Sequence, residues 1–285
     1  MKSIKESKKS ILLIALAALV FMLGITNSSA HEIVNYNGIH MTVSEYTTLL
    51  NLGFTENQIY FMDEDTFESN KDLDATLLSQ TTRYYKTVYP TYGNGYTIEI
   101  TEDEYNSSNN GGSNILGIVN TEYKTIVSSI SQNGNKYRYN VSTAWKIMPS
   151  TRSYDIIGIG FSNPVYISSS VYFNFTYANS AGAYTTSTQY YNKKSTSTGG
   201  AAVYKLPSGT IKSLSANLYY DVSKNTTNTI TNLAICGDYA HATSSVPAAN
   251  ISNYSIGISG INLGSTIGGY YDATPCAMEY ASVSW

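Results

Sequence analysis

Residues 132–146 read Gln-Asn-Gly-Asn-Lys-Tyr-Arg-Tyr-Asn-Val-Ser-Thr-Ala-Trp-Lys. The Asn-Gly pair at 133–134 is the strongest local signal for a tight hairpin turn, because both residue types tolerate positive φ. After the turn, aromatic and β-branched residues alternate with polar ones, which is the pattern of a strand with one buried face. The alternating residues are Tyr137, Tyr139, Val141, Thr143 and Trp145. This stretch predicts an antiparallel hairpin.

The same alternation recurs along the rest of the chain, between turns rich in Gly, Asn and Ser. It covers residues 165–177, 211–222, 233–237, 254–260 and 277–285. Many short strands without a convincing helix predict a mainly β fold, with an antiparallel β-sandwich or jelly-roll-like domain over residues 115–285. No repeat of fixed length is present, which disfavours a propeller or a solenoid.

Upstream of this domain, residues 81–105 predict a further β-hairpin. Tyr84, Lys86 and Val88 lie on one face before Pro90, and residues 92–95 supply the turn. Residues 106–114 contain only Ser, Asn and Gly, a composition typical of a flexible polar linker.

Residues 31–80 predict an acidic segment of short helices. The helix starts are marked by side chains that can accept a hydrogen bond from the backbone amide three residues later. The expected cap pairs are Thr42 with Glu45, Thr55 with Gln58, and Asp63 with Thr66. Helices this short are not stable alone, so they must pack on each other or on the β domain. The run 63–65 resembles the start of a calcium loop but lacks its glycine, so no metal site is predicted.

Charge divides the chain unevenly, although its formal net charge is only −3. Residues 31–105 carry thirteen acids against three basic residues, whereas residues 106–285 carry six acids against ten. Two interpretations stay open: the acidic segment docks on the basic domain or meets a different partner, or it is a solvated acidic face. The absence of a basic excess argues against a nucleic-acid partner.

Residues 1–30 have the three-part layout of a signal peptide. Four lysines precede a continuous apolar run at 11–25, and small residues occupy 28–30. The apolar run is short for a membrane span. We therefore expect a secreted protein, extracellular or loosely associated with the envelope.

The two cysteines, Cys236 and Cys276, are expected to form a disulfide in an exported chain. The alternative is chemical: a hydrolase in which Asp238 and His241 serve as the catalytic pair. No recognised hydrolase, phosphate-binding or dinucleotide-binding motif accompanies these residues, and no cofactor is implied. The chain is therefore predicted to act without catalysis.

A binding role suits the 27 tyrosines, whose rings offer flat apolar faces with a hydroxyl at the tip. The candidate contact residues are Tyr139, Trp145, Arg152 and Tyr154. Arg152 has two interpretations, a charge pair with Asp155 or a contact with an anionic ligand. The expected partners are a cell-wall polymer, a glycan or a protein.

Residues 165–191 support a different alternative, a hairpin that lines a β-barrel pore after assembly. One face carries apolar residues such as Phe173 and Phe175, the other carries Asn174 and Thr176, and the hairpin contains no charged residue. An ordinary sandwich hairpin has the same pattern. A membrane partner is expected only under this alternative.

Several segments of the chain resemble uncharacterised secreted proteins of Gram-positive bacteria. They are Leu49–Glu56, Asn70–Leu73, Thr82–Lys86, Trp145–Asp155 and Gly237–Ala242. The resemblance implies export from a Gram-positive cell and implies no activity or site residue. Together with the composition, it favours a secreted binding or interaction protein that is not an enzyme.

Overall fold

The computed structural model describes residues 32–91, 95–108, 118–162, 164–272 and 274–285. The predicted signal peptide at 1–30 and residues 109–114 of the predicted linker lie outside the described residues. Within the described ranges, no helix combines the length and the hydropathy that crossing a bilayer requires.

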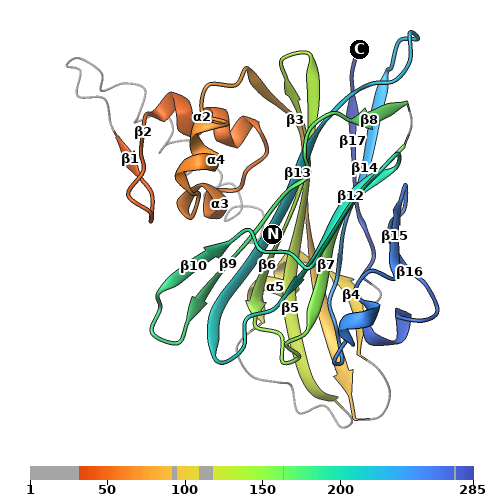
Figure 1. Cartoon of the computed structure of the whole chain (residues 1–285). Coiled ribbons are helices and arrows are strands. Elements are labelled where there is room, and N and C mark those ends of the chain that lie inside the picture. Colours follow the sequence, from red (N-terminus) through yellow and green to blue (C-terminus); the bar gives the residue numbers. More distant parts are fainter. Residues whose placement is uncertain (1–31, 92–94, 109–117, 163, 273) are drawn as a thin grey trace, which may run out of the picture.

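Two antiparallel sheets pack face to face, as Figure 1 shows, which confirms the predicted mainly β fold with a sandwich body. The larger sheet has the order β10-β9-β13-β6-β5-β3-β4, and β8 also pairs with β13. Its strands are β3 (Ala75–Pro90), β4 (Tyr96–Ile100), β5 (Ile118–Asn133), β6 (Lys136–Ile147), β8 (Val165–Ile167), β9 (Tyr172–Asn179), β10 (Tyr184–Ser187) and β13 (Ile211–Lys224).

The smaller sheet has the order β11-β12-β7-β14-β17, and the hairpin β15–β16 lies on its outer side. Its strands are β7 (Tyr154–Phe161), β11 (Asn192–Thr196), β12 (Gly199–Lys205), β14 (Asn232–Ala240) and β17 (Ala277–Ser282). The outer hairpin comprises β15 (Tyr254–Gly257) and β16 (Gly260–Leu263), and two short 3-10 turns, η1 (Ala248–Asn250) and η2 (Gly268–Tyr270), flank it in the chain.

The core between the sheets follows from the alternation in the strands. Tyr139 and Val141 of β6 face Ile157 and Ile159 of β7, and Tyr220 of β13 joins the same cluster. The residues between them in sequence point to the outer sides, since successive side chains of a strand face opposite ways. The turn predicted at residues 133–134 joins β5 to β6, with Gly134 at a positive φ of 58°.

The N-terminal segment, which we call the head (residues 32–74), covers part of the outer face of the larger sheet (Figure 1). It contains β1 (Ile33–Val34), β2 (His40–Met41), α2 (Val43–Asn51), α3 (Glu56–Tyr60) and α4 (Glu64–Glu68). The three predicted caps are confirmed, with complete capping boxes at α2 and α3. Leu49, Leu52 and Phe67 form the apolar centre of the head, and Tyr219 of the larger sheet packs against it.

The boundary between head and sheet differs from the prediction, which placed short helices up to residue 80 and a hairpin at 81–105. Strand β3 begins at Ala75 and pairs with β5 along nearly its whole length, so the β3–β4 hairpin is part of the larger sheet. The hairpin ends at Ile100, and Thr101 caps α5 (Glu102–Ser107), which takes in the first two residues assigned to the linker. The error arose because residues 75–80 alternate only weakly, and their strand conformation depends on β5, which is more than forty residues away in sequence.

The disulfide between Cys236 and Cys276 is confirmed, with 5.6 Å between the two Cα atoms. It joins β14 to the segment just before β17, its neighbour in the smaller sheet. The pore-hairpin residues form β8, β9 and β10, and Phe173 and Phe175 of β9 lie in the sandwich core.

Candidate functional site

Two of the four predicted contact residues are inside the protein. Tyr139 is fully buried and Trp145 is only 5% exposed, because both belong to the core face of β6. The expectation that they contact a ligand at the surface is therefore wrong. Arg152 and Tyr154 are partly exposed at the start of β7, but Arg152 makes no ion pair with Asp155 among the described contacts. Asp155 is instead engaged by His241, at 2.9 Å.

The structure separates the hypothesised catalytic pair. Asp238 and His241 are three residues apart at the end of β14, an odd spacing that places them on opposite faces of the sheet. Asp238 accepts hydrogen bonds from the backbone amides of Tyr239 and Ile261, while His241 points between the sheets. Burial raises the pKa of Asp238 to about 7, although these two amides oppose the shift. The pair has no shared geometry for catalysis.

His241 belongs to a buried charge network between the two sheets. Its Nδ1 lies 2.9 Å from Asp155 and its Nε2 lies 3.6 Å from Glu122. Burial lowers the pKa of His241, but the Asp155 and Glu122 carboxylates outweigh burial and leave the pKa above its ordinary value. Lys124 and Asp272, both fully buried, form an ion pair of 2.5 Å in the same network. All these groups are enclosed, so the network joins the sheets. Asp272 also borders a hollow of about 360 Å³ that is lined by Asp238 and Cys276.

An open site lies elsewhere, between the head and the larger sheet. Two adjoining hollows of about 560 and 460 Å³ share Ser69, Tyr172, Thr188 and Tyr219 in their walls, and we call them together the head–body groove. One end is lined by Asp63, Glu64, Asp65 and Thr186, and the other by Arg138, Ser169, Ser170, Tyr190, Lys193 and Asp221.

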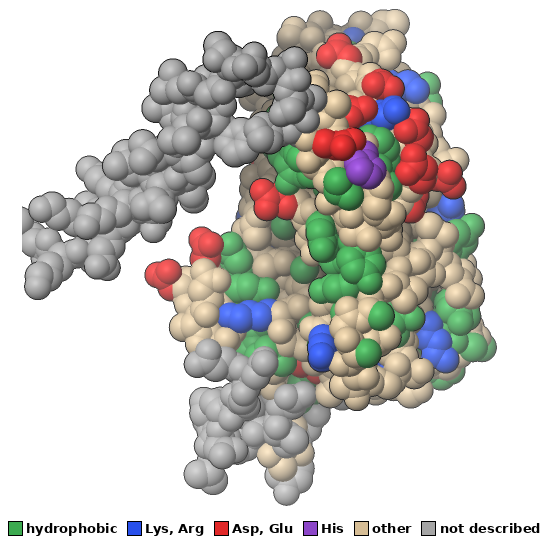
Figure 2. Space-filling model, turned by 90° about the vertical axis from the view of Figure 1, so that its left-hand side faces the viewer, with side chains coloured by type: hydrophobic (Ala, Val, Ile, Leu, Met, Phe, Trp, Pro, Cys, Tyr) green, Lys and Arg blue, Asp and Glu red, His purple; other side chains and the backbone are tan. Residues whose placement is uncertain are grey.

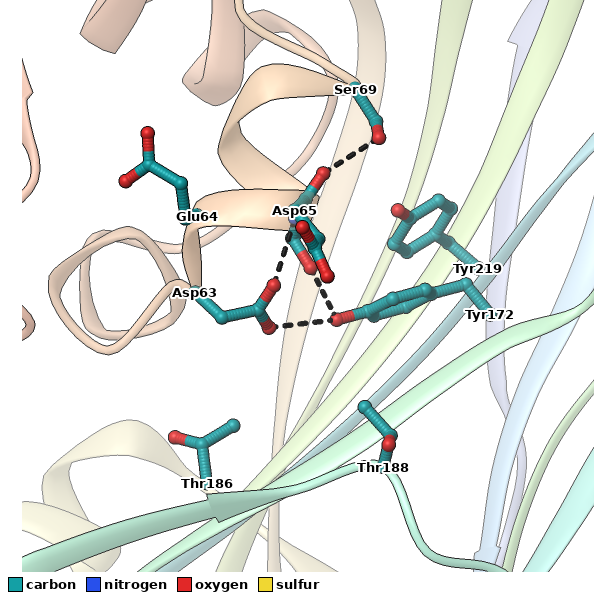
Figure 3. A pocket seen from close by; sticks show the side chains of 9 residues that line it. Asp63, Glu64, Asp65, Ser69, Tyr172, Thr186, Thr188 and Tyr219 are labelled. Atoms are coloured by element: carbon teal, nitrogen blue, oxygen red, sulfur yellow. Dashed lines mark hydrogen bonds between the residues drawn. The ribbon is translucent and has the colours of Figure 1, made fainter.

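The middle of the groove is built from two tyrosines on neighbouring strands. Tyr172 of β9 and Tyr219 of β13 are direct partners in the register, and their rings stack with centroids 4.6 Å apart. Figure 3 shows the ring of Tyr172 nearly edge-on, with Tyr219 on one side. On the other side lies the hollow, which Thr186 and Thr188 border. The second face of the Tyr172 ring is therefore turned toward the open space.

The hydroxyl of Tyr172 is held in place by the head. It lies 2.6 Å from the hydroxyl of Thr66, donates to Asp63 at 3.4 Å and accepts from Asn174 at 3.2 Å. Burial raises the pKa of Tyr172, so the phenol stays protonated at neutral pH. Asp63 has a second role as the N-cap of α4, because it accepts from the amide of Thr66. The cap that begins the helix thus also positions the carboxylate in the groove.

At the far end of the groove the charged groups are largely paired. The guanidinium of Arg138 donates to Asp221 at 2.8 Å and to the side chain of Asn70 at 2.5 Å. Lys193 donates to the carbonyl of Val171 and lies over the ring of Tyr190, with 4.7 Å from Nζ to the centroid. Tyr190 is therefore held beside the groove while the residue remains 45% exposed.

This arrangement combines an aromatic face, hydroxyl groups and carboxylate acceptors along one open channel. Among the described residues, no group of three or more His, Cys, Asp or Glu side chains is placed to hold a metal ion. The chemistry on offer is hydrogen bonding and ring stacking with a polar ligand.

The sequence-based reasoning did not select the groove residues. Asp63 was identified as a helix cap and as part of a rejected calcium loop, and Tyr172 was not singled out. A signal was available, because the alternation of β9 places Tyr172 on the polar face with Asn174 and Thr176. An aromatic residue on an otherwise polar strand face is a candidate ligand contact. Nothing in the sequence indicated that the head covers this strand face, since the contact joins residues more than one hundred positions apart.

Comparison with known proteins adds little. No protein-family model matches the chain, and no curated protein matches it. Among solved structures, the chain is matched to Clostridium perfringens delta-toxin with a TM-score of 0.17 and 8% identity, over 74% of this chain and 98% of that one. A similarity this weak supports no conclusion about the fold or the function.

Proposed function

We propose that the protein is a secreted, non-enzymatic binding protein that holds a carbohydrate in the head–body groove. The observation that carries the proposal is the stacked pair Tyr172–Tyr219, with one face of Tyr172 open to a hollow lined by hydroxyl and carboxylate groups.

The groove chemistry matches what a sugar presents. A pyranose ring has an apolar face of C–H groups, which packs well on a flat tyrosine ring, and a rim of hydroxyls that need hydrogen-bond partners. Asp63 and Asp65 supply acceptors, while Thr186 and Thr188 supply groups that both donate and accept. Tyr172 is fixed at both ends, by ring stacking and by its hydroxyl, so little side-chain freedom is lost on binding.

The alternative functions receive less support from the described residues. A hydrolase using Asp238 and His241 has no common site for the two groups. A hairpin that enters a membrane requires Phe173 and Phe175 to leave the core. Neither alternative uses the open groove.

The test is a binding measurement on the purified protein against an array of wall-type glycans and their fragments, followed by calorimetry on any that bind. We expect Tyr172→Ala to lower the affinity for the bound glycan by about tenfold or more, because the stacking face is lost. Thr188→Val, at an exposed position, removes only one hydroxyl, and we expect a loss of about threefold.

Tyr166→Ala is the matched control, because Tyr166 is an exposed tyrosine on β8 and does not line the groove. The midpoint of thermal unfolding is measured for every variant, so that a loss of folding is not mistaken for a loss of binding. Failure of all glycans to bind the folded wild type, or equal binding by folded Tyr172→Ala and Thr188→Val, overturns the proposal.

A further inference from the structure

We infer that the ligand of the head–body groove is a stretch of a linear glycan without acidic groups, several sugar units long, and that Tyr190 forms a second subsite. The inference rests on the proposed function and specifies its ligand class.

The length of the groove follows from the strand register. Thr186 at one end pairs with Thr176, which pairs with Ser215 of β13, and Asp221 at the other end is six residues further along β13. At about 3.3 Å per residue, six residues span about 20 Å. That distance accommodates several pyranose rings in a row, so a single sugar would leave most of the groove unused.

The second subsite is marked by another aromatic ring. Tyr190 lies at the end of the groove away from the head carboxylates, and Lys193 holds its ring by a cation–π contact. Lys193 is itself anchored by its hydrogen bond to Val171, whose neighbour Tyr172 forms the central subsite. Two aromatic faces on one open channel suit a chain that presents sugar rings repeatedly, since each ring can stack separately.

The charge at the head end of the groove disfavours acidic polymers. The head carries nine acidic residues against one lysine over residues 32–74, and Figure 2 shows acidic side chains gathered on the upper part of its face. Three of these acids, Asp63, Glu64 and Asp65, line the groove itself. At the other end, Arg138 is paired with Asp221, and the ammonium of Lys193 donates to the carbonyl of Val171. A polymer with repeated phosphate or carboxylate groups meets repulsion along this wall.

The experiment uses the full chain and N-acetylglucosamine oligomers of β-1,4 linkage, from the monomer to the hexamer, with poly(glycerol phosphate) as the acidic polymer. We expect affinity to rise by about tenfold or more from the dimer to the hexamer and the acidic polymer not to bind. Tyr190→Ala should lower hexamer affinity by about tenfold and leave dimer affinity unchanged, because the dimer occupies only the central subsite.

Tyr191→Ala is the matched control. Tyr191 is the next residue, is 48% exposed, and packs against Tyr154 outside the groove, so its loss should not affect either oligomer. Tyr190 is at the surface, and its replacement is not expected to unfold the protein. Its midpoint of unfolding is compared with that of Tyr191→Ala.

The outcomes separate this inference from the proposed function. If oligomers bind and Tyr172→Ala weakens them, but affinity is the same for dimer and hexamer or Tyr190→Ala has no effect, the multi-subsite inference is wrong and the proposed function stands. Binding of poly(glycerol phosphate) at the groove also overturns the inference. If no oligomer binds the wild type, and the wider glycan array is negative too, the proposed function fails with it.

Discussion

The ion pair of Lys124 and Asp272 shows how charged residues are accommodated between the two sheets. Lys124 and Asp272 are both completely enclosed, and Asp272 also accepts from the hydroxyl of Thr97 and the amide of His241. A buried ion pair often adds little net stability, but an enclosed charge without its partner is strongly unfavourable. The network therefore makes each member depend on the others.

Lys124→Met is expected to lower the free energy of unfolding by about 3–5 kcal/mol, since it leaves the Asp272 carboxylate enclosed without its cation. The double variant Lys124→Met with Asp272→Asn should recover part of this loss. Urea unfolding followed by tyrosine fluorescence measures both. Lys86→Met, which breaks the exposed pair with Glu104, is the control and should cost less than about 1 kcal/mol. Equal costs for Lys124→Met and Lys86→Met would contradict the prediction.

Contacts between residues close in sequence were predictable, whereas contacts made only by the folded sheets were not. The cap pairs at Thr42, Thr55 and Asp63 were predictable because a cap and its amide are three residues apart in sequence. The separation of Asp238 from His241 was predictable too, from the odd spacing on a strand, but the spacing was not used. The partners of Lys124 and His241 were not predictable, since Asp272 and Asp155 reach them only through the folded sheets.

Among the elements, helix α2 depends on how its end meets the larger sheet. Gly53 follows the helix with a φ of 87°, and its carbonyl accepts from the side chain of Asn140 on β6 at 2.7 Å. A Cβ atom at this position would lie 2.1 Å from the Oγ of Ser129 on β5. The glycine therefore allows both the turn and the close approach of the head.

Gly53→Ala is expected to loosen the head, because the added methyl collides with Ser129 in addition to straining the backbone. Gly38→Ala is the matched control: Gly38 has a similar φ of 79°, but nothing lies within 4 Å of the added atom. Hydrogen exchange in α2, α3 and α4 should become faster in Gly53→Ala than in Gly38→Ala, while exchange in β6 and β7 stays slow. Similar head exchange in the two variants would show that the contact with β5 does not hold the head.

Element types were more predictable than element partners. The Asn-Gly turn before β6 and the alternation of β9 and β13 identify strands and their buried faces from local sequence. The outer face of β13 also carries Asn217 and Tyr219, and nothing local indicates that a head of short helices covers them. The groove arises from that covering, which explains why sequence patterns alone pointed to the wrong contact residues.

For the whole molecule, the sandwich limits which parts can move. Strand β9 is paired along its length with β13, and Phe173 and Phe175 are buried against the smaller sheet. Release of the β9–β10 hairpin would break that pairing and open the core. The pore-forming alternative requires this release, whereas binding at the groove does not.

We expect the native protein to cause no release of calcein from phosphatidylcholine vesicles at concentrations where glycan binding is saturated, because the apolar side of β9 is already packed. The assay is calibrated by adding detergent, which gives full release. Release above the buffer level would instead support the pore-forming alternative and count against a purely binding role.

The position of the head has a consequence for biosynthesis. The head comes from the first part of the described chain, but it rests on Tyr172 and Tyr219, which are made more than one hundred residues later. Because the chain is synthesised from its N-terminus, the head leaves the ribosome before β9 and β13 exist. The ring of Phe54 then lacks its packing partner Tyr219. The last steps of assembly therefore close the groove, so a chain interrupted before β13 is translated has no complete site.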